Sequence, residues 1–253
     1  MDLNHFIMRP GHILKKIKQN IGSTIEETTI KELISLAKSF DQSLIDQEIK
    51  KADTQMFENG IVAVADISNT NHSFRTKEKS SIYYHTFIEL YSLNPNLAKQ
   101  TFENGIKLQR ECKTTSSLVP HANYSVSTLL FDLLKHNNRG DLLSIHNQET
   151  EAENQMFYDG SGLLYDSIQN RKFFNSTGKS AIQSTFPYLA QTKTLLVHNT
   201  FTSIEDMNWI NSKRDNIYWC TCPNANLFIE NKLPSYSDLL ASNSTITLSL
   251  IHI

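Results

Sequence analysis

The sequence predicts an α/β fold, namely an incomplete (β/α)8 barrel of the TIM type with about seven of its eight strands present. Three observations lead to this prediction. Short apolar runs alternate with segments of helical periodicity along most of the 253 residues. The runs are apolar almost throughout, as expected of parallel strands that are buried on both faces. A histidine stands at the carboxyl end of three of the runs, where such barrels keep their active-site residues.

Seven strands are expected, because seven short runs are rich in β-branched, aromatic and other apolar residues. They are residues 61–67, 83–90, 117–120, 142–145, 194–197, 217–222 and 245–248. Helices are expected where apolar residues recur three and four positions apart. These segments are residues 26–40, 44–58, 96–111, 127–134, 150–158, 181–190 and 203–211. Gly60 follows the second of them, as is common where a helix ends and a strand begins.

The missing strand is expected at the amino end, since the long segments before residue 59 read as helices. No linker or internal repeat divides the chain, so that residues 1–247 are expected to form one barrel domain. The connection 158–180 contains Gly160, Gly162 and Gly178 and is the longest in the chain. We expect it to act as a lid over the active site.

Composition excludes several classes of protein. Hydrophobic residues make up 39% and charged residues 20% of the chain, and the formal net charge is −2. No basic surface for nucleic acid is indicated, and no apolar run approaches the roughly 18 to 20 residues that span a bilayer. The three cysteines, Cys112, Cys220 and Cys222, are too few for a disulfide framework and are expected to be reduced and structural. We therefore expect a cytoplasmic protein with neither a nucleic acid nor a membrane as partner.

The three strand-end histidines are His121, His146 and His198, and Glu149 follows the second of them at H-x-x-E spacing. A neutral imidazole is a common metal ligand, and a nearby carboxylate can relay protons. This pattern predicts a metal-assisted hydrolase. The alternative is that Glu149 and Thr150 begin the next helix, where a carboxylate is favoured by the helix dipole.

Four motifs resemble, in order, consecutive motifs of the amidohydrolase superfamily. They are residues 120–127 (PHANYSVS), 145–150 (IHNQET), 197–200 (VHNT) and 222–227 (CPNANL). The branch they resemble is the cytosine-deaminase-like and chlorohydrolase-like one, which includes S-adenosylhomocysteine and aminodeoxyfutalosine deaminases. The resemblance extends from residue 1 to about residue 247.

The resemblance implies a role for each of five residues. His146 corresponds to a metal ligand, Glu149 to the proton shuttle, and His198 to a catalytic histidine that touches metal-bound water or substrate. His121 and Asn226 correspond to substrate-binding positions, the second in a supporting role. The fourth strand of the family pattern carries no lysine here, which favours one divalent ion, Zn²⁺ or Fe²⁺, over a bridged pair.

The activity implied by the resemblance is hydrolysis of a carbon–nitrogen bond other than a peptide bond. Water activated by the metal would deaminate a small purine-like or other nitrogen-heterocyclic substrate. Two alternatives stay open. One is a non-catalytic, degenerate barrel, and the other is a chlorohydrolase-type displacement on a heterocycle. The sequence leaves the assembly open, with a homodimer among the possibilities.

The resemblance also implies ligands that this sequence does not contain. The family pattern opens with an H-x-H pair, and residues 2–5 (DLNH) resemble the stretch that follows this pair. The pattern closes with an aspartate after its last strand, which corresponds to residues 245–247. We therefore expect a chain truncated at both ends, in which His146 is the one implied ligand present. Such a chain is expected to retain no metal and to be inactive. Residues 248–253 (LSLIHI) match a translated sequencing adapter and are expected to be read-through.

Overall fold

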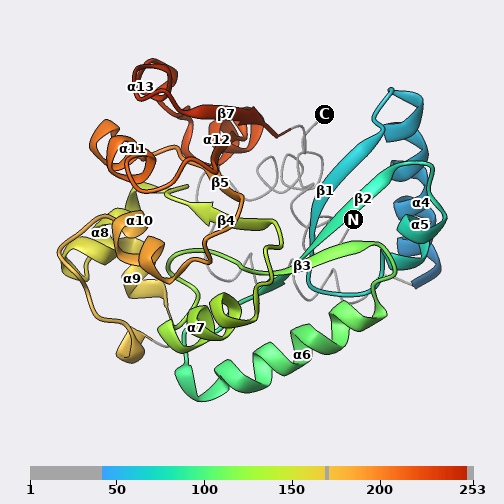
Figure 1. The fold of residues 1–253 in the computed structure, drawn as a ribbon, viewed down its shortest axis with the longest axis horizontal. Helices are drawn as coiled ribbons and strands as arrows, with labels where there is room; N and C mark the ends of the chain where they lie inside the picture. The colour runs from blue at the N-terminus through green and yellow to red at the C-terminus, as the bar shows by residue number, and fades with distance from the viewer. Residues whose placement is uncertain (1–41, 169–170, 250–253) are drawn as a thin grey trace, which may run out of the picture. The chain divides into compact units, whose positions relative to one another are not determined.

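The computed structural model describes residues 42–168 and 171–249 (Figure 1). The helix expected at 26–40 and most of the segment expected to be read-through, residues 250–253, lie outside the described residues. Helices and strands alternate as expected, and all seven expected strands are present. They are β1 (Ala63–Ser68), β2 (Tyr83–Leu90), β3 (Thr115–Pro120), β4 (Leu143–Asn147), β5 (Thr194–His198), β6 (Ile217–Thr221) and β7 (Thr245–Leu248).

The strands form two sheets, with the order β1-β2-β3 in one and β4-β5-β6-β7 in the other. β1 pairs with β2 in parallel, and so do the neighbours within the second sheet. The end of β3 reaches β4 through a single parallel bridge between Ala122 and His146, where the His146 amide donates to the carbonyl of His121 at 2.9 Å. The pairings among the described residues do not close a ring.

The chain divides into two compact units, one of residues 1–88 and 107–116 and the other of residues 89–106 and 117–253. In the first, α4 (Gln42–Glu58) packs against α5 (Phe74–Lys79). The Lys77 ammonium is buried there, 2.6 Å from the Asp66 carboxylate and 2.9 Å from the Ser68 hydroxyl. A buried charge needs such a partner. This cluster holds α5 to the end of β1.

In the second unit, helices precede and follow the strands of the four-stranded sheet along the chain. They are α7 (Thr128–Asn137), α8 (Glu151–Asp159), α9 (Gly162–Ser167), α10 (Ala181–Thr185), α11 (Ile204–Asn211), α12 (Pro223–Glu230) and α13 (Tyr236–Ala241), with α6 (Ala98–Glu111) divided between the units. α10 packs against α8 and α11, and Figure 1 shows the three on one side of β4 and β5. Trp219 of β6 is fully buried, and its indole donates to Asn211 at 3.2 Å.

The helix predictions are correct for the long segments and incomplete for the short ones. The segment 181–190 is α10 followed by a 3-10 turn (Phe186–Tyr188), because Pro187 has no N–H to continue the helix. Four short helices were not predicted: α5, α9, α12 and α13, each of six to eight residues. Such lengths give too little periodicity to read. α9 lies within the expected lid, which is therefore partly helical.

β7 includes Leu248, which pairs with Thr221 of β6. The strand therefore continues one residue past position 247, where the barrel domain is expected to end. The domain boundary itself stays a prediction. No helix in the described part of the chain has the length and apolar character that crossing a membrane requires.

Candidate active site

The three strand-end histidines converge. His121 follows β3, His146 lies in β4 and His198 ends β5. The ring centroids of His121 and His146 are 5.2 Å apart, and those of His146 and His198 are 5.3 Å apart. The parallel register explains this, because Asn147 of β4 pairs with His198 of β5 and brings the two strand ends level. The geometry expected from the sequence is present.

Two carboxylates complete the group. Oε1 of Glu149 lies 3.3 Å from Nε2 of His198, and Oε1 of Glu89 lies 3.3 Å from Nε2 of His146. Oε1 of Glu149 is buried and makes no hydrogen bond. A buried carboxylate oxygen without a donor is costly unless a proton or a cation reaches it. Glu149 and His198 are therefore arranged so that a proton or a cation can bind at Oε1 of Glu149.

Glu89, His121 and His146 form a group able to hold a metal ion. Their ligand atoms all lie within 4.8 Å of one another, and no other such group of three exists among the described residues. Two imidazole nitrogens and a carboxylate oxygen suit Zn²⁺ or Fe²⁺. The residues present therefore fit the ion that the resemblance implies. The sequence prediction included His146 as a ligand but missed Glu89, whose signal is a carboxylate near the end of an otherwise apolar strand.

The imidazole of His121 is neutral, which is the form that can bind a metal ion or accept a hydrogen bond from a substrate. Burial lowers its pKa to about 4, and the nearby His146 and His198 act in the same direction, whereas Glu89 opposes them. The imidazole is therefore neutral at pH 7. Its Nδ1 lies 2.7 Å from the hydroxyl of Ser125, which leaves Nε2 for a ligand or substrate.

Asn226 orients the ring of His198. Its Oδ1 is 2.9 Å from Nδ1 of His198, and its Nδ2 donates to the backbone carbonyl of the same residue at 3.3 Å. The second contact sets which end of the amide faces the ring, so Nδ1 donates to Oδ1 of Asn226 and Nε2 is turned toward Glu149. Asn226 is fully buried. The structure thus places it against His198, and its binding of substrate stays a prediction.

The backbone of the β5 end is held in an uncommon conformation. His198 has φ +81° and Asn199 has φ +58°, both in the left-handed region. Residues other than glycine rarely adopt this region, and functional sites are where such strain accumulates. The Asn199 side chain stabilises the turn by donating to the carbonyls of Leu196 at 2.7 Å and Cys220 at 3.2 Å.

A buried amide network beneath the histidines was not predicted. Asn147 accepts a hydrogen bond from Asn123 at 2.9 Å and donates to Asn199 at 3.0 Å. All three side chains are buried, and they come from the ends of β3, β4 and β5. The sequence does contain a signal for them, because each asparagine follows one of the site histidines by one or two positions. The network ties together the strand ends that carry the site.

The next helix does begin at Thr150, as the capping alternative expects, but Glu149 is not its capping carboxylate. Thr150 is the N-cap of α8, and its partner in the capping box is Glu153, whose carboxylate accepts from the backbone N–H groups of Gln148 at 3.0 Å and Glu149 at 2.8 Å. The side chain of Glu149 points to His198 instead. Burial raises the pKa of Glu153 to about 8, with a smaller contribution from the charge of Glu149, while the backbone donors oppose the shift.

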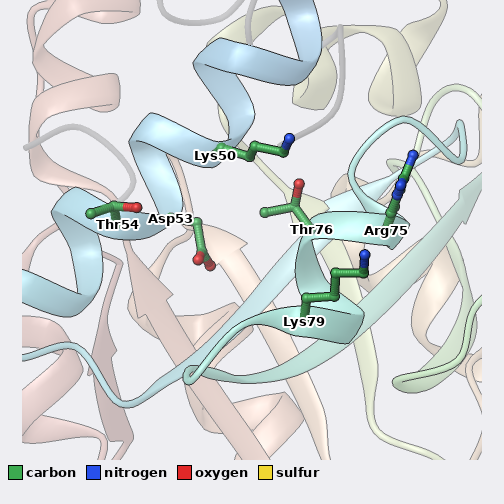
Figure 2. Close-up of a pocket in the computed structure, with 6 residues that line it drawn as sticks. All are labelled: Lys50, Asp53, Thr54, Arg75, Thr76 and Lys79. Atoms are coloured by element: carbon green, nitrogen blue, oxygen red, sulfur yellow. The ribbon is translucent and has the colours of Figure 1, made fainter.

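A separate pocket of about 320 Å³ lies between α4 and α5 in the first unit. Figure 2 shows Lys50 and Asp53 on α4 and Arg75 and Lys79 on α5 around it. Asp53 accepts hydrogen bonds from the hydroxyls of Ser80 and Tyr84, so it also serves the packing of this unit. None of the predicted site residues lines this pocket.

Comparison with known proteins gives the family likeness. No protein-family model matches the chain. An adenosine deaminase of Helicobacter pylori is 27% identical over 195 residues, which are 73% of this chain and 47% of that protein. The crystal structure of Helicobacter pylori aminofutalosine deaminase superposes with a TM-score of 0.68 at 22% identity, covering 81% of this chain and 53% of that one. An amidohydrolase from Brucella melitensis superposes with a TM-score of 0.66 at 11% identity, covering 90% and 55%.

The resemblance to the amidohydrolase superfamily is confirmed. The relatives include deaminases, as the four motifs predict, and the superpositions confirm the predicted fold class. The chain spans about half the length of the relatives that it matches. The amidohydrolase likeness thus agrees with the histidines and carboxylates that the structure brings together.

Proposed function

We propose that this chain is part of a metal-dependent hydrolase that acts on carbon–nitrogen bonds other than peptide bonds. Its reaction is the deamination of a purine-like or other nitrogen-heterocyclic small molecule. The observation that supports this most directly is the convergence of His146 and His198, with Glu149 3.3 Å from the second ring. The deaminase names of its relatives point the same way, and one relative binds methylthio-coformycin.

Glu149 is the proton carrier in this proposal. Its buried Oε1 lies 3.3 Å from Nε2 of His198 and has no hydrogen-bond donor, so this oxygen is placed where a proton can be taken up and passed on. The carboxylate takes a proton from the attacking water and delivers it to the ring nitrogen of the substrate as the C–O bond forms. It then takes the second proton from the added hydroxyl and delivers it to the amine, which leaves as ammonia when the C–N bond breaks. Asn226 keeps Nε2 of His198 turned toward this exchange.

His146 would be a ligand of one divalent ion, and the ligand atoms of Glu89 and His121 lie within reach of the same position. Bound there, the ion supplies Lewis-acid activation of water. Zinc is the ion in a structure of atrazine chlorohydrolase from Arthrobacter aurescens TC1, which has a similar fold with a TM-score of 0.63. We propose zinc or ferrous iron for this protein. We also propose a cytoplasmic location and a small-molecule partner rather than a nucleic acid or a membrane.

The 253-residue chain is expected to lose its zinc during dialysis against a chelator. Of the ligands that the resemblance implies, His146 alone is in the sequence, and a firmly held catalytic metal needs about three protein ligands. Glu89 and His121 already have contacts of their own, with His146 and Ser125. Zinc per chain measured by atomic emission after dialysis checks this expectation.

Stoichiometric zinc after that dialysis would contradict the expectation and would assign Glu89 and His121 as ligands. The variants Glu89→Gln and His121→Ala would then each release the ion. His136→Ala is the matched control, because this histidine is on the surface of α7, where its ring contacts the Asp132 carbonyl.

The function itself is tested with the protein encoded by the complete reading frame, loaded with zinc. We expect ammonia release from an aminated heterocycle in a panel that includes adenosine and cytosine, followed with a coupled glutamate dehydrogenase assay. If the protein releases chloride from a chlorotriazine and no ammonia from any aminated substrate, its reaction is dehalogenation and not deamination. A zinc-loaded protein that releases neither product would favour the non-catalytic barrel.

A further inference from the structure

The pocket between α4 and α5 has no part in the proposed reaction. It has a volume of about 320 Å³ and lies within the first unit. Every residue that lines it has a polar or charged side chain: Lys50, Asp53, Thr54, Arg75, Thr76 and Lys79. Pockets for apolar ligands are lined mainly by hydrophobic and aromatic side chains. This pocket therefore suits a polar or charged ligand.

Positive charge predominates in the pocket, although the formal net charge of the whole chain is −2. Lys50, Arg75 and Lys79 are exposed, and none of the three forms an ion pair within the part of the chain that the structure describes. Lys77 on the same short helix differs, because its ammonium lies 2.6 Å from the Asp66 carboxylate. Like charges around one hollow repel one another, and an anion bound between them relieves the repulsion.

The carboxylate that lines the pocket is engaged in packing. Oδ1 of Asp53 accepts hydrogen bonds from the hydroxyls of Ser80 at 2.6 Å and Tyr84 at 2.7 Å. Figure 2 shows Lys50 reaching from α4 toward the side chains of α5, whereas the Asp53 carboxylate points away from the Lys50 ammonium. Asp53 therefore joins α4 to the residues after α5 and leaves the three cations available to a ligand.

The donors in the pocket fit a phosphate group. A guanidinium such as that of Arg75 binds phosphate through two parallel N–H donors, and a lysine ammonium acts as a point charge. The hydroxyls of Thr54 and Thr76 can each donate to a phosphate oxygen. The volume is at the lower end of the roughly 300 to 1,000 Å³ of small-molecule sites. The pocket thus has room for a phosphate and for a small group that carries it.

We propose that this pocket is a phosphate-binding site, with Lys50 of α4 and Arg75 and Lys79 of α5 as the residues that hold the anion. A phosphate ester of a small molecule and free phosphate share this chemistry, and titration with each separates the two sources. None of these residues belongs to the candidate active site, and the proposal does not rest on the hydrolase activity.

The test is a calorimetric titration of the 253-residue chain, in a phosphate-free buffer of low ionic strength, with inorganic phosphate, ribose 5-phosphate and ribose. These sugars are used because a purine nucleotide would also be a ligand for the candidate active site. We expect ribose 5-phosphate to bind and ribose not to bind. Tighter binding of ribose 5-phosphate than of phosphate would support an ester as the ligand, and equal binding would support the free ion.

Arg75→Gln and Lys79→Gln should each weaken this binding at least about 10-fold, because each removes a charge-assisted hydrogen bond. Lys51→Gln is the matched control, since Lys51 is the neighbour of Lys50 on α4 but pairs with Glu48 at 3.7 Å. Absence of binding by either phosphate compound, binding of ribose as tight as that of its phosphate, or an equal loss in Lys51→Gln would overturn the proposal.

Lysine acetylation followed by mass spectrometry gives a second measurement that needs no variant. Saturating ribose 5-phosphate should slow the acetylation of Lys50 and Lys79 several-fold in the unchanged chain. Lys99 of α6, whose side chain is 83% exposed, should react at the same rate with and without the ligand. Unchanged rates at Lys50 and Lys79, or equal slowing at Lys99, would rule out the site even if the variants fail to fold.

Discussion

Glu149→Gln in the complete protein is expected to lower kcat for ammonia release by roughly 10² to 10⁴, the usual contribution of a positioned general acid–base group. Glutamine keeps the size of the side chain but cannot carry a proton between water and substrate. Because Glu149 is not one of the three residues whose ligand atoms cluster, zinc content should stay unchanged. Steady-state kinetics and metal analysis on the same preparation check both parts.

Glu151→Gln is the control for that variant. Glu151 is two residues away in the first turn of α8 and is exposed. The Glu151→Gln variant should keep the kcat and the zinc content of the unchanged protein. If Glu149→Gln keeps nearly full kcat, Glu149 is not the proton carrier. If the variant loses zinc as well as activity, the Glu149 carboxylate is a metal ligand instead.

The free energy of unfolding is expected to fall as pH rises from about 4.5 to about 8, because of Glu153. Burial raises its pKa to about 8, whereas the carboxyl titrates near 4.5 when unfolded. Between these values the folded state keeps a proton that the unfolded state has released, so higher pH favours unfolding. At about 1.4 kcal/mol per pH unit, the loss reaches up to about 5 kcal/mol.

Urea unfolding of the unchanged chain and of Glu153→Gln, at several pH values across this window, measures the effect. The variant loses a backbone hydrogen bond at every pH, but its amide does not titrate, so its own pH slope should be smaller by the Glu153 contribution. Glu205→Gln, an exposed residue in the first turn of α11, should keep the slope of the unchanged chain. Parallel slopes for the unchanged chain and Glu153→Gln would show that Glu153 is ionised in the folded state.

The strands could be predicted from the sequence because their signal is local. The run that became β4 (Leu143–Asn147) is short and apolar, and the residues after it are polar, so its end is visible without any partner. The longer helices, such as α6 (Ala98–Glu111), show enough turns for their apolar spacing to be read. α5 and α13 have six residues each, and contacts from the rest of the fold decide that they are helical.

The candidate site divides in the same way. His121, His146 and His198 could be found because each follows an apolar run, and the parallel arrangement of those runs implies that their ends meet. Glu89 could not be assigned, since a carboxylate inside a strand sequence does not show which face it occupies. The structure places it 3.3 Å from Nε2 of His146.

By itself, the sequence determined the class of fold, the order of the strands and the positions of the histidines, because hydrophobic periodicity and strand ends are properties of adjacent residues. The tertiary structure alone decided which atoms face one another. Asn226 is 28 residues from His198 and yet orients its ring, and Asn147 joins residues from three strand ends. Such contacts depend on register and on side-chain direction across strands, which no local pattern encodes.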